Sequence, residues 1–347
     1  MAYTDIDDSS AYFQQEIYTG TGEAKTVTNT GNSDLQPAWL WQKNVSNSQD
    51  GRIFDSVRGG SKILYPSLTN AEASDNQLIT SFNSDGFTMG SSGTNVNDDG
   101  TTNIAWQWAT GTAFSNDASS TSVGNIDSAG SVSTTSGFSI ISYTGTGSAT
   151  TFAHGLGAVP KMIIFKNRTA AGSQWDTYHN GIGTAHRLYL DDTSAKSSAT
   201  NFINNTAPTS SVITVGDATH TNGNGNSHIA YCFTDIKGFS KFGSYVGNGD
   251  ANGTFVHTGF KPAFLLGKHT GIAGQHWFMN DSARGYNGGS HWLKADASDA
   301  QLTNLVAPDF LSNGFKLRNS SSSQNASGST YIYAAFAESP FSLARAR

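Results

Sequence analysis

The stretch YTGTG occurs twice in this chain, at Tyr18–Gly22 and at Tyr143–Gly147, and a looser copy, YVGNG, occupies Tyr245–Gly249. A glycine loop that cradles a phosphate would occur once, between a strand and a helix, with Lys and then Ser or Thr after it. Here the glycines recur, and strand-like residues follow each copy. We therefore expect each copy to form the end of a strand and a tight turn, where glycine permits positive φ angles.

Further motifs follow each copy in the same order. A proline-led apolar burst that carries a lysine comes first, as PAWLWQKN, PKMIIFKN and PAFLLGKH. An aromatic residue and an Asp-containing turn come next, as IFDSVRGG, QWDTYHNGIG and HWFMNDSARGYN; the middle copy matches through Trp175 and Asp176 but lacks the arginine. Segments aligned on Leu64, Leu188 and Leu293 follow, and each copy closes on alternating small and aromatic residues, as IAWQWA, IAYCFT and IYAAFA.

This ordered recurrence predicts three copies of one unit of about 95 residues. Short bursts rich in Ile, Val, Phe, Tyr and Trp between glycine-rich turns are typical of short strands, and no dozen-residue stretch shows helical periodicity. We predict an all-β protein with three tandem β-sandwich or jelly-roll-like repeats. The expected boundaries are 1–17 for an N-terminal arm, 18–110 for the first repeat, 111–137 for a Ser/Thr/Gly-rich linker, 138–236 and 237–338 for the second and third repeats, and 339–347 for a C-terminal tail.

The composition excludes several classes of function. Of the 347 residues only 13% are charged, the net charge is −6, and the basic residues are scattered, which argues against nucleic acid as a partner. The apolar bursts are too short to span a bilayer, and the N-terminus lacks the features of a secretory signal, so we expect no membrane insertion and synthesis in a cytoplasm. The single cysteine, Cys232, lies in the apolar run IAYCF and is expected to be buried and inert.

Signs of chemistry are weak. The chain has nine histidines, but the HExxH and GxSxG motifs are absent and one cysteine cannot build a thiolate zinc site. We expect no enzyme, no cofactor and no metal centre. The pairs Asp98–Asp99 and Asp191–Asp192 offer oxygen ligands for Ca²⁺, but such pairs are also ordinary turn residues. We favour turns and leave Ca²⁺ open.

One region is a weak candidate for a binding surface. Beside the aligned leucines stand Ile63, Arg187 and Trp292, which strand alternation turns away from those leucines. An arginine here suggests solvent, so Trp292, with Tyr286 and His291 in the neighbouring glycine-rich loop, could stack on a sugar or anchor an interface. The alternative, which we favour, is that Trp292 is buried against another part of the chain.

The segment GFSIISYTGTGSATTFAHGLGAVPKMIIFKNR (Gly137–Arg168) resembles a motif of structural proteins of tailed bacteriophages, especially marine ones. The N-terminal MAYTDIDDSSAYFQQEIYTGTG, together with LQPAWLWQKN and FDSVRG, is similar to the start of the same proteins. The resemblance covers most of the chain. It implies a virion component of tail-fibre-like type with repeated β-sandwich domains, and it brings no catalytic residues.

We therefore predict a non-enzymatic virion protein, a tail fibre or tail-associated adhesin for host attachment. Its expected partners are further copies of itself, with a trimer as the guess, other virion proteins and a host-surface glycan. The alternatives are a capsid decoration or head-fibre protein that stabilises the shell, and a tailspike enzyme that degrades polysaccharide, which would need paired carboxylates in a groove.

Overall fold

The computed structural model describes residues 6–339, except 92–94, 110, 286, 288 and 290. Strands dominate the described part of the chain, and the helices found there are single turns. The prediction of an all-β protein is confirmed. Within these residues no helix has both the length and the apolar character needed to cross a membrane.

The elements follow one another along the chain in three stretches. The first contains η1 Ser9–Ala11, β1 Phe13–Thr19, β2 Lys25–Val27, β3 Trp39–Asn44, β4 Arg52–Asp55, β5 Lys62–Ile63, β6 Ala73–Ser74, β7 Ile79–Phe82, β8 Phe87–Met89 and β9 Thr102–Trp108. The second contains β10 Thr112–Asn116, α1 Ala118–Thr121, β11 Ser128–Ser133, β12 Phe138–Thr144, β13 Thr150–Ala153, β14 Met162–Asn167, β15 Asp176–His179, η2 Asn180–Ile182, β16 His186–Tyr189, β17 Ser197–Ser198, β18 Val212–Val215, α2 Thr219–Asn222 and β19 Ser227–Phe233. The third contains β20 Ser240–Val246, β21 Phe255–His257, β22 Lys261–His269, β23 Phe278–Asp281, β24 Leu293–Lys294, β25 Asp309–Leu311, β26 Gly314–Lys316 and β27 Thr330–Ser339.

Each stretch contributes one large antiparallel sheet. The strand orders are β1-β9-β3-β4 in sheet 1, β10-β11-β12-β19-β14-β15-β16-β17 in sheet 2 and β20-β27-β22-β23-β24 in sheet 3. In all of them the closing strand lies between the strand that ends in Tyr-x-Gly-x-Gly and the proline-led strand. A smaller sheet accompanies each large one, with the orders β2-β8-β7, β13-β18 and β21-β26-β25.

Alternation along the strands divides the apolar side chains between separate cores. In β14, Met162 and Ile164 point into a central core, whereas Ile163 and Phe165 point into a local core beneath the small sheet β13-β18. In β3, Trp39 and Trp41 enter the same central core, and Leu40 enters a local one. These proline-led strands are buried along their whole length because both of their faces are covered.

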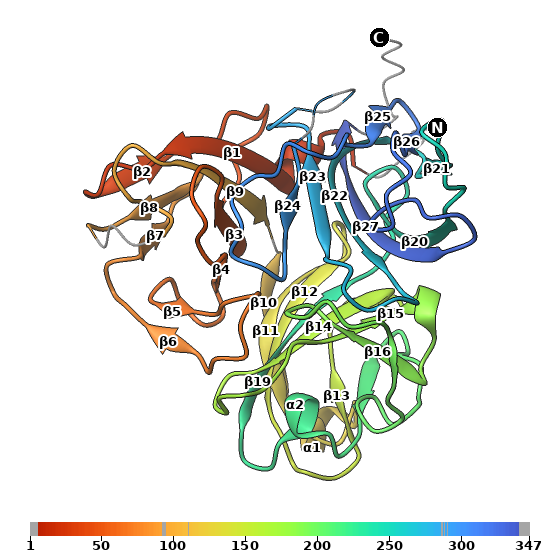
Figure 1. The fold of residues 1–347 in the computed structure, drawn as a ribbon. Helices are drawn as coiled ribbons and strands as arrows, with labels where there is room; N and C mark the ends of the chain where they lie inside the picture. Colours follow the sequence, from red (N-terminus) through yellow and green to blue (C-terminus); the bar gives the residue numbers. More distant parts are fainter. Residues whose placement is uncertain are drawn as a thin grey trace.

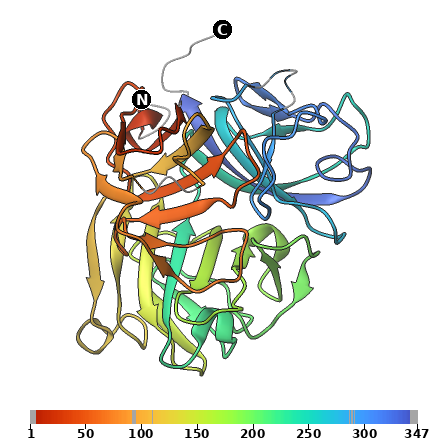
Figure 2. The same ribbon diagram turned by 60° about the vertical axis from the view of Figure 1, so that its left-hand side comes forward.

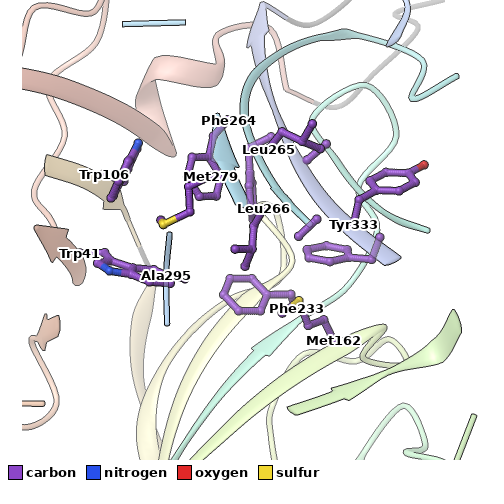
Figure 3. Close-up of a cluster of buried hydrophobic side chains, with 14 of the residues drawn as sticks. Trp41, Trp106, Met162, Phe233, Phe264, Leu265, Leu266, Met279, Ala295 and Tyr333 are labelled. Carbon is purple, nitrogen blue, oxygen red and sulfur yellow. The ribbon is translucent and has the colours of Figure 1, made fainter. Parts of the chain in front are cut away.

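The central core joins the three large sheets. Figures 1 and 2 show three lobes that meet along the inner faces of these sheets, with sheet 1 in red to gold, sheet 2 in gold to teal and sheet 3 in teal to blue. Figure 3 shows side chains that all of them contribute to this core, among them Trp106, Met162 and Phe264. The space left at the centre is about 10 Å³ and is lined by apolar side chains, roughly one water-sized sphere.

Segments expected to lie outside the repeats are part of the sheets. The stretch Gly111–Gly137, expected as a linker, forms β10, α1 and β11, and β11 pairs with β12 from Ser128 to Ser133. Strand β11 consists mostly of Ser, Ala and Gly residues, and it pairs with β12 in a regular antiparallel ladder. Strand β1 begins at Phe13, inside the segment 1–17 that was expected to be an arm. Of the expected tail 339–347, Ser339 ends β27, and 340–347 lie outside the described residues.

Candidate interaction site

Among the described residues proposed from sequence, Trp292 does not offer an exposed aromatic surface. Tyr286 lies outside the described residues. Trp292 is only 6% exposed and belongs to the central core, so its ring has no free face for a sugar. Nδ1 of His291 lies 2.8 Å from Nε2 of Gln301, and the backbone N–H of Gln301 donates to the carbonyl of Val45. The loop beside Trp292 therefore packs against the end of β3, as the favoured alternative had it.

The Tyr-x-Gly-x-Gly motif forms a corner that an asparagine stabilises. In the second stretch, the Tyr143 hydroxyl donates to the Thr221 carbonyl at 2.5 Å, and the N–H of Gly147, at φ +72°, donates to the Asn222 carbonyl. A Cβ on Gly145 would lie 2.3 Å from the Gly223 carbonyl oxygen. The side chain of Asn222 accepts from the N–H of Thr146 and donates to the carbonyls of Ser148 and Gly216.

The same corner occurs at the two other motifs. Tyr18 pairs with the Val96 carbonyl and Tyr245 with the Gln324 carbonyl, and Asn97 and Asn325 take the place of Asn222. These asparagines were not predicted from the sequence. A signal was present, because Asn97, Asn222 and Asn325 each lie seven residues before the isoleucine of the closing strand.

Two buried Asp–Arg pairs connect neighbouring sheets. Asp55 accepts from the backbone N–H of Arg58 at 2.8 Å and from its Nε at 2.5 Å, and the Tyr231 hydroxyl of sheet 2 donates to the same carboxylate at 2.7 Å. Asp281 and Arg284 repeat this arrangement, and the Trp106 indole of sheet 1 lies 3.3 Å from the Asp281 carboxylate. Each carboxylate thus receives a donor from the next sheet.

In the second stretch a histidine, not Asp176, stands in this place. Register pairs Trp39 with Asp55, Phe264 with Asp281 and Met162 with His179. The match of Asp176 to Asp55 made from sequence is therefore three residues out of register. Nδ1 of His179 accepts the N–H of Gly181 and its Nε2 lies 3.1 Å from the Tyr333 carbonyl of sheet 3, so the ring is neutral with its proton on Nε2. Burial lowers the pKa of His179 to about 4.

The lysines of the proline-led strands are buried. Lys43, Lys166 and Lys268 are at most 1% exposed, and burial lowers the pKa of each to about 8. Their ammonium groups donate to loop carbonyls: Lys43 to Ala297, Lys166 to Ser173 and Lys268 to Gln275. These bonds join a strand to the loop beside it, and for Lys43 that loop belongs to the third stretch.

Asp176 belongs instead to a partly exposed polar cluster with Arg187, Tyr189 and His220, which we call the second-lobe cluster. Nη1 of Arg187 lies 3.1 Å from the fully buried Asp176 carboxylate, and Nδ1 of His220 lies 3.5 Å from its other oxygen. The Arg187 guanidinium stacks 4.7 Å from the centre of the Tyr189 ring. The side chains of Arg187 and His220 are 18% and 24% exposed, so the cluster reaches solvent.

The exposed part of this cluster consists of the Arg187 and His220 side chains. Oδ1 of Asp176, Nε of Arg187 and Nδ1 of His220 are themselves buried and have no hydrogen-bond partner among the described residues. The equivalent positions differ in the two other stretches: register places Arg52 and Phe278 where Asp176 stands, and Ile63 and Trp292 where Arg187 stands. Partly exposed donors beside an aromatic ring suit a small polar ligand with several hydroxyl groups.

Other groups considered from sequence take part in local structure. Cys232 is buried, and burial raises the pKa of its thiol to about 12. Asp192 accepts the backbone N–H of Ser194 at 2.8 Å, which is turn chemistry, whereas Asp191 accepts the backbone N–H of Trp175 at 2.9 Å and so joins two separate segments. Within the described ranges, no three His, Cys, Asp or Glu side chains gather closely enough to hold a metal ion.

Comparison with known proteins gives one match. A family described as a domain of unknown function (DUF7483) matches residues 8–340, which is nearly the whole chain. No curated protein and no solved structure matches.

Proposed function

This chain belongs to the DUF7483 family, and we propose that it is a non-enzymatic structural protein of tailed-bacteriophage virions that binds a host-surface glycan. The virion assignment is supported by the resemblance of Gly137–Arg168 and of the N-terminal segment to phage structural proteins. The binding assignment is supported by the second-lobe cluster. A position on the tail, as a fibre-like adhesin, is part of the proposal.

The proposal includes three copies of one β-sandwich unit, at residues 18–110, 138–236 and 237–338. The shared strand order, the Tyr–Asn corner and the buried lysine support a common origin of the copies. Contacts between copies also correspond: Tyr231 of the second reaches Asp55 of the first, Trp106 of the first reaches Asp281 of the third, and the Tyr333 carbonyl of the third meets His179 of the second.

Such a scaffold suits attachment because it holds its surface loops rigidly. We had expected a homo-oligomer with three-fold symmetry. Since three units in one chain already surround a common core, we propose that the three-fold arrangement lies within the chain and that chains assemble through another contact. Several copies on one particle then turn weak contacts with a glycan into useful avidity.

The second-lobe cluster carries the glycan proposal, because it differs from the equivalent positions of the other copies. Sugar hydroxyl groups can accept from the partly exposed side chains of Arg187 and His220, which the buried Asp176 carboxylate holds in place, while the Tyr189 ring offers apolar contact. The Asp176 carboxylate and the Arg187 guanidinium cancel in charge, which favours a neutral glycan over an anionic one.

Glycan binding is tested by screening the purified chain against neutral glycans of bacterial envelopes. Arg187→Ile introduces the residue found at the aligned position of the first copy, and we expect it to weaken binding at least about tenfold, since two donors are lost. His220→Ala is the second variant if Arg187→Ile folds poorly. Lys241→Ala, which removes an ion pair remote from the cluster, should bind like the wild type. Unchanged binding in both cluster variants contradicts the assignment of this site.

The virion assignment is tested separately. We expect mass spectrometry of purified phage particles to detect the chain and labelling to place it on the tail. Detection in lysate but never in particles would refute the virion assignment, and labelling of the capsid shell would favour a decoration protein.

A further inference from the structure

The outer edge of β1 is open, whereas the equivalent edge is paired along its length in sheet 2 and closed in part in sheet 3. The N–H of Ala109 donates to the carbonyl of Tyr12, and that of Gly20 donates to Thr101. In an antiparallel ladder alternate residues face the partner, so even-numbered residues of β1 face β9. The backbone groups of Gln15, Ile17 and Thr19 therefore point away from the sheet, and no described residue bonds to them; Phe13, at the start of the strand, is buried.

In sheet 2 the equivalent edge belongs to β12, and β11 closes it. Ser128–Ser133 pairs along β12 from Tyr143 to Phe138. In sheet 3 the edge strand β20 is closed only in part. The N–H of Phe242 donates to the Asp235 carboxylate, Ser240 exchanges backbone hydrogen bonds with Ile236, and the Thr254 hydroxyl donates to the carbonyl of Val246. The outward backbone groups of Ser244 have no partner in the described residues, but the groups on either side of them are partly bonded, so β1 keeps the longer unpaired run.

The side chains of β1 do not protect this edge. The strand reads FQQEIYT, without the proline or lysine that commonly blocks edge-to-edge pairing. Ile17 is 44% exposed, one of the larger apolar side chains left in contact with solvent. An open edge with an exposed β-branched residue is a template for another strand.

We infer that β1 pairs antiparallel with β1 of a second copy of this chain, so that two copies of sheet 1 form one continuous sheet. A two-fold axis at Ile17 brings the two Ile17 side chains together and pairs Gln15 with Thr19 of the other copy. In that register Glu16 stands opposite Tyr18. An axis at Glu16 would instead oppose two carboxylates, which is unfavourable. The self-complementary arrangement around Ile17 is the reason for choosing a second copy as the occupant.

This contact does not depend on the proposed function, because it uses only the edge of β1. It is tested by sedimentation velocity of the full chain over a wide range of concentration. We expect a monomer–dimer equilibrium. Ile17→Pro removes an outward N–H without breaking a bond to β9, and proline is tolerated at such edge positions; this variant should be monomeric. Ile17→Lys, which places two ammonium groups at the axis, should be monomeric too.

Matched controls separate this edge from general stickiness. Ile272 is 49% exposed elsewhere on the surface, so Ile272→Lys should dimerise like the wild type, as should Ile17→Val. Hydrogen exchange of the Gln15, Ile17 and Thr19 amides should slow as concentration rises. A wild-type chain that stays monomeric up to its solubility limit contradicts the inference, as does a trimer or a dimer that survives both Ile17→Pro and Ile17→Lys.

Discussion

Three buried lysines are the least expected single residues of this structure. A lysine in a continuous apolar strand would ordinarily be assigned to the surface, yet Lys43, Lys166 and Lys268 are at most 1% exposed and each donates to a loop carbonyl. The ammonium form loses hydration on burial, which is why the pKa of each falls to about 8. The lysines therefore stabilise particular loop positions while costing stability in their charged form.

This cost predicts an unusual dependence of stability on pH. The folded-state pKa lies below the unfolded value, so between about pH 8 and pH 10.5 the unfolded state binds more protons and stability rises with pH. Each lysine contributes at most about 1.4 kcal/mol per pH unit. The buried tyrosines and Cys232, whose pKa values are raised by burial, act in the opposite direction at higher pH, so the rise is expected between about pH 7.5 and pH 9.

Urea unfolding of Lys166→Met at several pH values tests this. The variant keeps the length of the side chain without the charge, and its stability should rise less steeply with pH over this interval than that of the wild type. Lys241→Met, at a side chain that is 42% exposed, should keep the wild-type profile. Equal slopes for Lys166→Met and the wild type would contradict the argument.

At the scale of elements, the corners formed by Tyr-x-Gly-x-Gly fix where β1, β12 and β20 end. The asparagine side chain uses both its carbonyl and its amide on backbone groups of two different loops, as a substitute for strand pairing where the ladder stops. The corner therefore depends on one side chain rather than on a particular turn type.

We expect Asn222→Ala to destabilise the fold by about 3 kcal/mol, because the backbone groups of Thr146, Ser148 and Gly216 lose their partner, the Gly216 carbonyl at a buried position. Chemical denaturation gives this value directly. Asn224→Ala, at an exposed position two residues later, should change stability by less than about 0.5 kcal/mol. A loss for Asn222→Ala as small as that of the control would mean that water replaces the asparagine.

Most strands could be predicted from sequence, but the segments that pair with them or pack against them could not. Alternation and proline placement located β3, β14, β22 and the closing strands, since these are local patterns. The strands of Gly111–Gly137 have few apolar side chains, so the sequence pattern does not indicate them. Their position is set by pairing along the edge that β12 would otherwise leave open. Analogy with Arg187 left an exposed Trp292 open beside the favoured burial, because that burial depends on the loop beside it packing against the end of β3, a contact between residues far apart in the chain.

At the scale of the whole molecule, one aromatic core connects the three large sheets. The ring of Trp39 lies 4.6 Å from that of Trp108 in its own sheet and 4.9 Å from that of Tyr231 in sheet 2. Phe336 of sheet 3 lies 5.3 Å from Trp108 and 6.0 Å from Phe233. No lobe can leave this core without exposing aromatic surface on the other two.

The shared core predicts that the lobes unfold together, although chains of this length often unfold domain by domain. Trp39→Ala should cost about 3–5 kcal/mol, as large cavities in cores do, and it should lower the stability of all lobes by the same amount. Hydrogen exchange followed by mass spectrometry through the denaturant transition can report each lobe separately. We expect one midpoint for the peptides of β9, β19 and β27 in both the wild type and the variant. The comparison is Phe87→Ala, which removes a ring from the local core of the first lobe. If the coupling between lobes is complete, the three midpoints of this variant should also coincide. Midpoints that separate only in Phe87→Ala would show that the local cores, and not the central one, set the cooperative unit.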